Sequence, residues 1–331
     1  MSSSTTAPPP SDYPAAFAPT PGNVFDLSSL KNWVRSLDSA AKSLWVAGLV
    51  GVGLLVVLFW PSLTHLVYTW STDDNYSHGF LVPLISLYFA REASVDEPLQ
   101  RRGGLILGCA LLVLCLVGRM ATTIVPVGVL SDLAFVAGLA GLVSALAGRQ
   151  AIGRYGFALF FLVFMIPLPI ALYSAIASPL QLLVSRVAAV LLGFMGIPVL
   201  CQGNTMTLPG DVHLFVAEAC SGMRQLSGFL ALTTAVAWFS PRPLWYRLVI
   251  VASSIPIALT ANLLRVTLTA WLAYAVDPAL ARGQFHTVEG LLLMGVGLSM
   301  LWAECTALSY LVPEGYSATH GVQASNQGAT S

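Results

Sequence analysis

The sequence has 331 residues, of which 56% are hydrophobic and only 9% are charged. Soluble domains carry about 25% charged residues, so this composition excludes an ordinary water-soluble domain. The formal net charge is zero, and nothing in the composition suggests a nucleic-acid partner. We therefore predict an all-α polytopic membrane protein.

In chain order, residues 1–40 are rich in Ser, Thr, Pro and Ala and are predicted to form a disordered cytoplasmic tail. Residues 41–313 are predicted to form one membrane-embedded domain, and residues 314–331 a second disordered tail. Apolar stretches close to the length that crosses a bilayer predict about eight transmembrane helices. These are expected at 43–61, 77–91, 103–120, 124–147, 152–171, 219–239, 245–272 and 288–312.

The positions of Lys and Arg predict the orientation of these helices, because cytoplasmic loops are enriched in both residues. Basic residues precede the first expected span and occupy every second connection after it, whereas the opposite loops are poor in them. They are Lys31, Arg35, Lys42, Arg91, Arg101, Arg102, Arg149, Arg154, Arg242 and Arg247. A cytoplasmic N-terminus satisfies this pattern.

Residues 172–198 are apolar but contain Gln181 and Arg186 near their middle. A single crossing here would place Arg242 and Arg247 outside, so we expect a helix that lies in the outer interface or re-enters. Residues 199–208 then predict a small outer-face β-hairpin that turns at Gly203-Asn204, with a possible further strand at 212–216.

This topology brings three chemistry-bearing residues to the outer membrane face. Cys220 begins the sixth expected span, Arg265 lies near the end of the seventh, and His286 precedes the eighth. A thiol at a helix N-terminus is favoured as thiolate, and a histidine near neutral pKa can serve as general acid or base. Arg265 could hold a substrate carboxylate or stabilise an oxyanion.

Two further residues share helix faces with this group. Arg224 lies four residues after Cys220 and adds a cation, and Asn262 lies three residues before Arg265 and could donate to the same oxygen.

Structural alternatives remain for each of these residues. Cys220 could be a core residue or form a disulfide with Cys201, Arg265 could be an interface residue, and His286 a loop residue. A polar cluster at Trp70–Gly79 could be a metal site, although its spacing fits no standard ligand pattern, and a substrate-facing or structural loop is favoured. A transporter or membrane scaffold with an Arg- and His-lined path is the alternative function.

Ordered motifs then identify a family. Residues 75–83 (NYSHGFLVP), 197–204 (IPVLCQGN), 218–224 (EACSGMR) and 262–266 (NLLRV), with His286 and Gly290, resemble the exosortase/archaeosortase family. The resemblance covers about residues 44–312 and depends on the order of the motifs more than on any one of them.

The resemblance implies a membrane cysteine transpeptidase that cleaves C-terminal sorting signals of exported proteins outside the membrane. The implied substrates carry a short motif such as Pro-Glu-Pro, a transmembrane helix and a basic tail. The product would pass to a membrane-linked acceptor. Cys220 would be the nucleophile, His286 the acid/base and Arg265 the electrostatic residue, with Arg224, Asn262 and Glu218 in supporting roles. The implied location is the cell (inner) membrane, with exported proteins and membrane lipid as partners and no cofactor or metal.

Overall fold

The computed structural model describes residues 39–93, 103–124, 127–210, 212–215, 222–277 and 285–311. The expected disordered tails and the residues Glu218 and Cys220 therefore lie outside the described residues. The chain divides into two compact units, residues 1–49 and 50–331. Residues 39–49 of α2 belong to the first unit, and all other described residues belong to the second.

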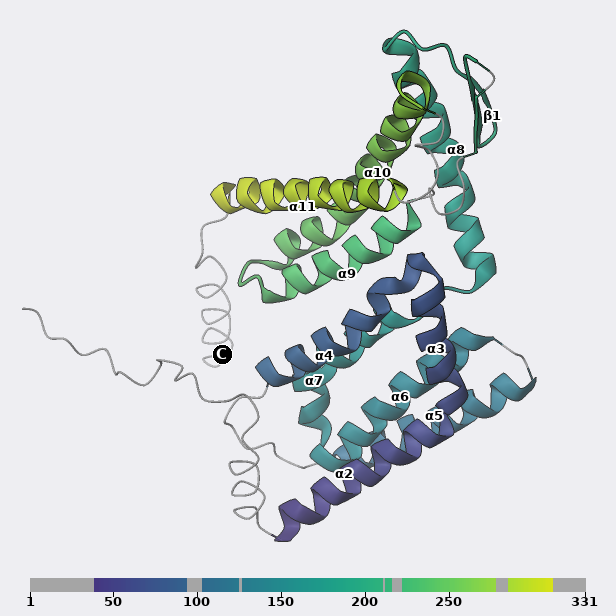
Figure 1. The fold of residues 1–331 in the computed structure, drawn as a ribbon. Coiled ribbons are helices and arrows are strands. Elements are labelled where there is room, and N and C mark those ends of the chain that lie inside the picture. The colour runs from purple at the N-terminus through teal and green to yellow at the C-terminus, as the bar shows by residue number, and fades with distance from the viewer. Residues whose placement is uncertain are drawn as a thin grey trace, which may run out of the picture. The chain divides into compact units, whose positions relative to one another are not determined.

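The described residues are mainly helical (Figure 1). The first group of helices is α2 (Ser39–Leu58), α3 (Trp60–Thr72), the 3₁₀ helix η1 (Asp74–Phe80), α4 (Leu81–Glu92), α5 (Gly104–Ile124), α6 (Gly128–Ala147), α7 (Arg149–Phe161) and the 3₁₀ helix η2 (Leu162–Met165). The second group is α8 (Ile170–Phe194), α9 (Met223–Phe239), α10 (Leu244–Ala275) and α11 (Phe285–Leu311).

An all-α polytopic membrane fold is confirmed, but the expected count of eight spans is not. Among the described residues, five helices are long and apolar enough to cross a membrane, or six if the bent pair α2 and α3 forms one span. The expected spans at 77–91 and 152–171 are α4 and α7, with only 12 and 13 residues. About 20 residues are needed to cross a bilayer, so neither helix crosses it alone.

The shortening of the helix expected at 152–171 has a local cause. The residue before a proline is disfavoured in the α region, and Ile166, which precedes Pro167, has an extended backbone at ψ 122°. Hydropathy alone predicts one continuous helix across this break, because the residues on both sides are apolar.

Residues 172–198 fold largely as α8, which has 25 residues and also passes the length and hydropathy test for a span. Its interfacial or re-entrant placement stays a prediction. The side chain of Gln181 is buried in α8, whereas that of Arg186 is exposed.

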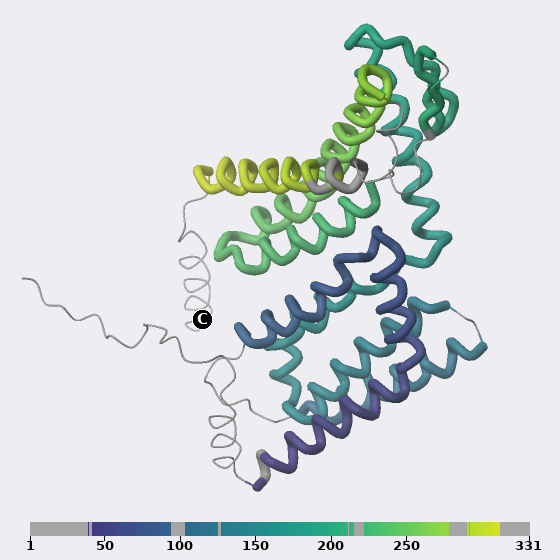
Figure 2. The backbone as a smooth tube through the Cα atoms, viewed as in Figure 1, coloured from purple at the N-terminus to yellow at the C-terminus, as the bar shows by residue number. Residues whose placement is uncertain are grey.

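The predicted hairpin is confirmed and extended to three strands. β1 (Leu200–Gln202) pairs antiparallel with β2 (Thr205–Leu208), and β2 with β3 (Val212–Phe215). Gly203 turns the chain between β1 and β2 with φ 63°. The sheet packs on α8 and α10 through a common apolar core that includes Met206, Leu192 and Val266, and Figure 2 shows the chain passing from α8 through these strands.

The main chains of helices α5 and α6 lie in close contact, with no side chain between them at the glycines. A Cβ atom added at Gly108 would lie 2.6 Å from the main-chain nitrogen of Ala145. The hydroxyl of Ser144 donates a hydrogen bond of 3.0 Å to the carbonyl of Gly104, so the small residues let a polar contact form between the helices.

We expect Gly108→Ala to destabilise the protein by about 1–3 kcal/mol, because the new methyl group overpacks a contact with main chain that cannot move aside. Thermal unfolding in detergent measures the effect. Gly153→Ala in α7 is the matched control, since its Cβ would meet no atom within 4 Å. Alanine normally favours a helix over glycine, so the control should keep or raise the melting temperature. Equal melting temperatures for the two variants would contradict the close packing.

Candidate functional site

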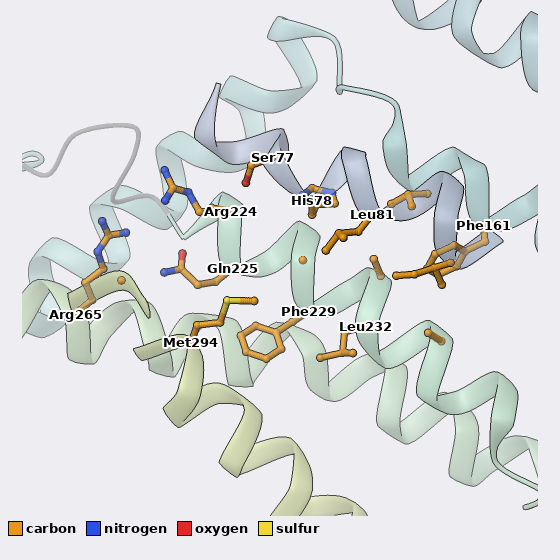
Figure 3. Close-up of a pocket in the computed structure, with 16 residues that line it drawn as sticks. Ser77, His78, Leu81, Phe161, Arg224, Gln225, Phe229, Leu232, Arg265 and Met294 are labelled. Carbon is orange, nitrogen blue, oxygen red and sulfur yellow. The ribbon is translucent and has the colours of Figure 1, made fainter. Parts of the chain in front are cut away.

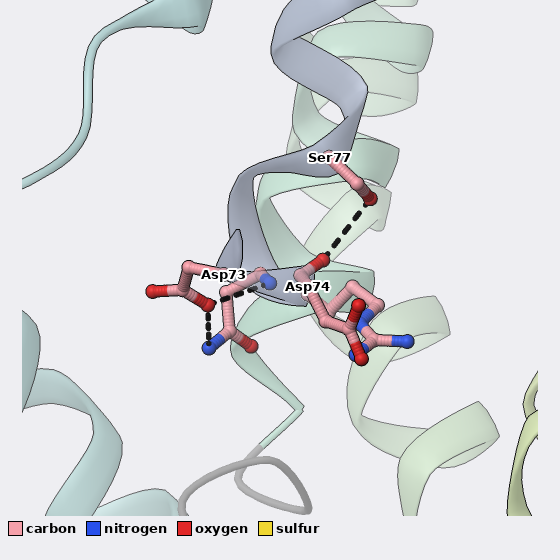
Figure 4. A network of polar contacts seen from close by, with 5 residues as sticks. Asp73, Asp74 and Ser77 are labelled. Carbon is pink, nitrogen blue, oxygen red and sulfur yellow. Dashed lines mark hydrogen bonds and ion pairs between the residues drawn. The ribbon is translucent and has the colours of Figure 1, made fainter. Parts of the chain in front are cut away.

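The polar segment before α4 forms a short structured turn. Asp73 caps η1, because one carboxylate oxygen accepts hydrogen bonds of 2.9 Å from both the main-chain and the side-chain nitrogen of Asn75. The hydroxyl of Ser77 donates to the carbonyl of Asp74 at 3.1 Å (Figure 4). The cap and this second bond stabilise a tight 3₁₀ turn.

Contacts with distant elements hold η1 in place. The indole nitrogen of Trp70 donates to the carbonyl of Met165 at 2.9 Å, and a Cβ atom at Gly79 would lie 2.3 Å from that nitrogen. The His78 Nε2 atom lies 3.2 Å from the carbonyl oxygen of Phe164. These contacts tie η1 to α3 and η2.

Burial lowers the pKa of the His78 imidazole, and interactions with the carbonyl oxygens of Phe164 and Asn75 only partly oppose this shift. The imidazole is therefore neutral at pH 7, since its ordinary pKa is about 6.5. In the neutral ring, Nε2 must carry the hydrogen to donate to the Phe164 carbonyl. Among the described residues, no cluster of His, Cys, Asp and Glu suits a metal ion, so the alternative of a metal site has no support there.

Helix α9 meets η1 through polar contacts. The guanidinium of Arg224 forms an ion pair with the carboxylate of Asp74. The hydroxyl of Ser227, one turn further on, lies 3.4 Å from the carbonyl oxygen of Asn75 and 2.9 Å from that of Met223. The Asp74 carboxylate is 80% exposed, so the pair adds little stability and serves mainly to orient Arg224.

Helix α10 supplies two buried polar residues, Asn262 and Arg265, which are 0% and 3% exposed. A helix rises about 1.5 Å per residue, so Arg265 lies about 32 Å along the axis from the first residue of α10. The hydrocarbon core of a bilayer is about 30 Å thick. Arg265 and the basic residues Arg242 and Arg247 at the beginning of α10 are therefore separated by about one membrane thickness.

The beginning of α9 lies directly against Asn262. Gly222 caps α9 in the left-handed conformation with φ 82°. A Cβ atom at Gly222 would lie 3.2 Å from each of three Asn262 side-chain atoms. The contact brings Gly222, the last residue of the EACSG segment, against a residue one helical turn before Arg265 on α10.

One pocket of about 520 Å³ joins these elements (Figure 3). Figure 3 shows the side chains of Arg224, Gln225 and Arg265 at one end and those of Phe161 and Leu232 towards the other. The described residues that line it are Ser77, His78, Leu81, Val82, Ile85, Phe161, Arg224, Gln225, Gly228, Phe229, Ala231, Leu232, Ala235, Arg265, Gly290 and Met294. The pocket thus has a cationic end that suits an anion or a developing oxyanion, and an apolar end that suits hydrocarbon.

The structure brings together part of the predicted site. Arg224 and Arg265 line the same pocket, and Asn262 packs against Gly222 behind them. Cys220 and Glu218 lie outside the described residues, and so does the side chain of His286. The backbone at His286 belongs to α11, one turn before Gly290, which lines the pocket.

Sequence reasoning did not assign Gln225, Ser77 or His78 to the site, yet all three line the pocket. Ser77 and His78 belong to the polar segment for which the sequence favoured a substrate-facing or structural loop, without assigning either residue to the site. No sequence feature assigned Gln225 to the site, apart from its position next to Arg224.

A protein-family model described as transmembrane exosortase matches residues 70–303, which is more than half of the chain. The matched range includes every residue assigned here to the pocket. Comparison with curated proteins gives no match, and comparison with solved structures gives none.

Proposed function

Because this chain belongs to the transmembrane exosortase family, we propose that it is a membrane cysteine peptidase and transpeptidase. Its substrates are exported proteins that end in a short motif, a transmembrane helix and a basic tail. It cleaves this C-terminal sorting signal and transfers the acyl product to an acceptor. The family and the apolar helices make the chain an integral membrane protein.

The observation that carries the proposal is the buried Arg265 in the wall of a pocket beside Arg224. An arginine this deep in an apolar bundle is costly and is retained where it has a functional partner. Gly222 packs against Asn262, one turn from Arg265. Consecutive Cα atoms lie about 3.8 Å apart, so the covalent chain keeps Cys220 within about 7.6 Å of Gly222. This limit on the chain is compatible with the proposal that Cys220 and Arg265 act on one carbonyl group.

The mechanism follows from the chemistry of these groups. His286 takes the thiol proton, and the Cys220 thiolate attacks the carbonyl carbon of the scissile peptide bond. Arg265 stabilises the oxyanion that forms, and Asn262 supports the same oxygen or the backbone beside it. The C–N bond then breaks, the leaving amine takes the proton from His286, and a thioester with Cys220 remains. An amine, a hydroxyl or water attacks the thioester and releases the thiol.

The extracytoplasmic face of the cell (inner) membrane is the proposed site of reaction. The separation of Arg265 from Arg242 along α10, about one membrane thickness, supports this orientation if the basic residues face the cytoplasm. Arg224 and Glu218 support the site electrostatically. Membrane lipid surrounds the substrate helix, and the reaction as written needs no cofactor.

Co-expression with a tagged substrate that bears such a signal tests the function. We expect Cys220→Ala and Cys220→Ser to abolish processing, because neither can form the thioester. Cys201→Ala is the matched control, because Cys201 is a free thiol in the neighbouring sheet, and it should process like the wild type. Wild-type levels of processing by Cys220→Ala would overturn the proposed role of Cys220. A wild-type protein that processes no such substrate would favour a non-enzymatic role such as transport.

A further inference from the structure

Among the described residues that line the pocket, Gln225 is buried and polar and has no role in the proposed mechanism. It follows Arg224 on α9, its side chain is 8% exposed, and it lines the pocket beside Arg265. Figure 3 shows its amide group at the cationic end, on the side where Arg224 and Arg265 lie. It therefore lies between the apolar lining of the pocket and the two arginines.

The Oε1 atom of Gln225 is fully buried and accepts no hydrogen bond from any residue that the structure describes. A buried acceptor without a donor is costly, so native proteins keep few of them. The described groups nearest to it in the pocket do not remove this cost. Arg224 directs its guanidinium to Asp74, and Leu81, Phe229 and Met294 offer only hydrocarbon to the pocket. The oxygen is therefore ready to accept from a bound ligand.

The chemistry of the pocket restricts the donor. Two arginines stand at this end, so a cationic donor such as an ammonium group would be repelled. A neutral N–H is favoured, and every non-proline residue of a peptide supplies one on its main chain. The apolar lining beyond Gln225 would take the adjacent apolar side chain.

We propose that Gln225 Oε1 accepts a hydrogen bond from one main-chain N–H of the bound sorting signal and so sets the register of the scissile bond. Gln225 is then a substrate-binding residue that reads the backbone of the signal. This inference rests on the proposed function, since it presumes a peptide substrate.

Binding and turnover are measured separately, so that the two proposals can fail independently. Binding uses a fluorescent peptide that carries the recognition motif and the beginning of the apolar segment, with full-length Cys220→Ala protein in detergent. Gln225→Met keeps the shape of the side chain and removes the acceptor. We expect it to raise Kd about 10-fold, which corresponds to the loss of one hydrogen bond. In the active protein it should raise KM by a similar factor and leave kcat within about 3-fold.

Gln181→Met is the matched control, because Gln181 is buried to a similar degree in α8 and does not line the pocket. It should leave Kd and KM unchanged. Gln225→Glu keeps an acceptor oxygen at the same place and should bind more tightly than Gln225→Met.

A series of peptides, each N-methylated at one backbone position, identifies the bond without relying on a variant. Methylation at one position should lower the affinity of the peptide about 10-fold for protein that has Gln225. The same methylation should lower its affinity for Gln225→Met very little. Additive losses at every position, or an unchanged Kd in Gln225→Met, would overturn the inference and indicate that water or an additive satisfies Oε1. If the peptide binds as described but the wild type never cleaves it, the proposed function fails and the binding role stands.

Discussion

Replacing Arg265 by Gln is expected to lower the rate of substrate cleavage by about 10²–10³-fold, the usual cost of removing one oxyanion-stabilising donor group. Arg265 is 3% exposed and lines the pocket, so its charge acts where little water screens it. Glutamine keeps a hydrogen-bond donor but not the cation. Arg265→Lys keeps the charge without the planar fork and should lose less, about 10-fold.

Initial cleavage rates in detergent, divided by the amount of monodisperse folded protein, measure this effect. Arg242→Gln is the control, since Arg242 is another arginine that immediately precedes α10 and lies outside the pocket. Its guanidinium packs 5.0 Å from the Tyr246 ring centroid, so the control also removes an arginine that contacts other residues. Cleavage by Arg265→Gln at the rate of Arg242→Gln would contradict an electrostatic role for Arg265.

Gly222→Ala is expected to combine a loss of stability with a larger loss of activity. At φ 82°, a side chain costs about 1–2 kcal/mol. The new Cβ would also lie 3.2 Å from three atoms of the fully buried Asn262, so the beginning of α9 must move. That movement displaces the chain between Cys220 and Arg224 relative to Arg265. A misplacement near 1 Å can cost about 10²-fold in rate, and we expect a loss of that size in kcat.

Gly210→Ala separates the two effects. Gly210 has the same φ of 82°, but a Cβ there would meet no atom within 4 Å. Both variants should lose the stability that a side chain costs at this φ, and Gly222→Ala should lose somewhat more because of its contact with Asn262. Only Gly222→Ala should lose kcat. Equal activity in the two variants would show that the contact between Gly222 and Asn262 has no part in positioning the site.

The elements that depend on local sequence were predicted well. Apolar composition predicted the membrane helices, and Gly203-Asn204 between short alternating segments predicted the hairpin, which the structure confirms. The predicted count of eight spans is not confirmed among the described residues, because hydropathy does not register the break at Pro167 or the shortness of α4. Helix length is set by such breaks as well as by the apolar content.

The site was predicted in part, for a related reason. Helical spacing placed Asn262 and Arg265 on one face of α10, and family motifs singled out Arg224, but periodicity carries no information about contacts between distant segments. The contact of η1 with α9, through Asp74 and Arg224, joins residues 150 positions apart. Residues of η1 and α9 line the pocket together, and the sequence alone does not show that Gln225 lies on the face of α9 that lines it.

The most direct test of the central claim is to look for the thioester on Cys220. Purified protein is mixed with a sorting-signal peptide, quenched in acid within the first turnover, digested and analysed by mass spectrometry. The account predicts an acyl adduct on the peptide that contains Cys220, removed by hydroxylamine and absent from Cys220→Ala. Cleavage of the peptide with no adduct at Cys220, and undiminished cleavage by Cys220→Ala, would contradict it.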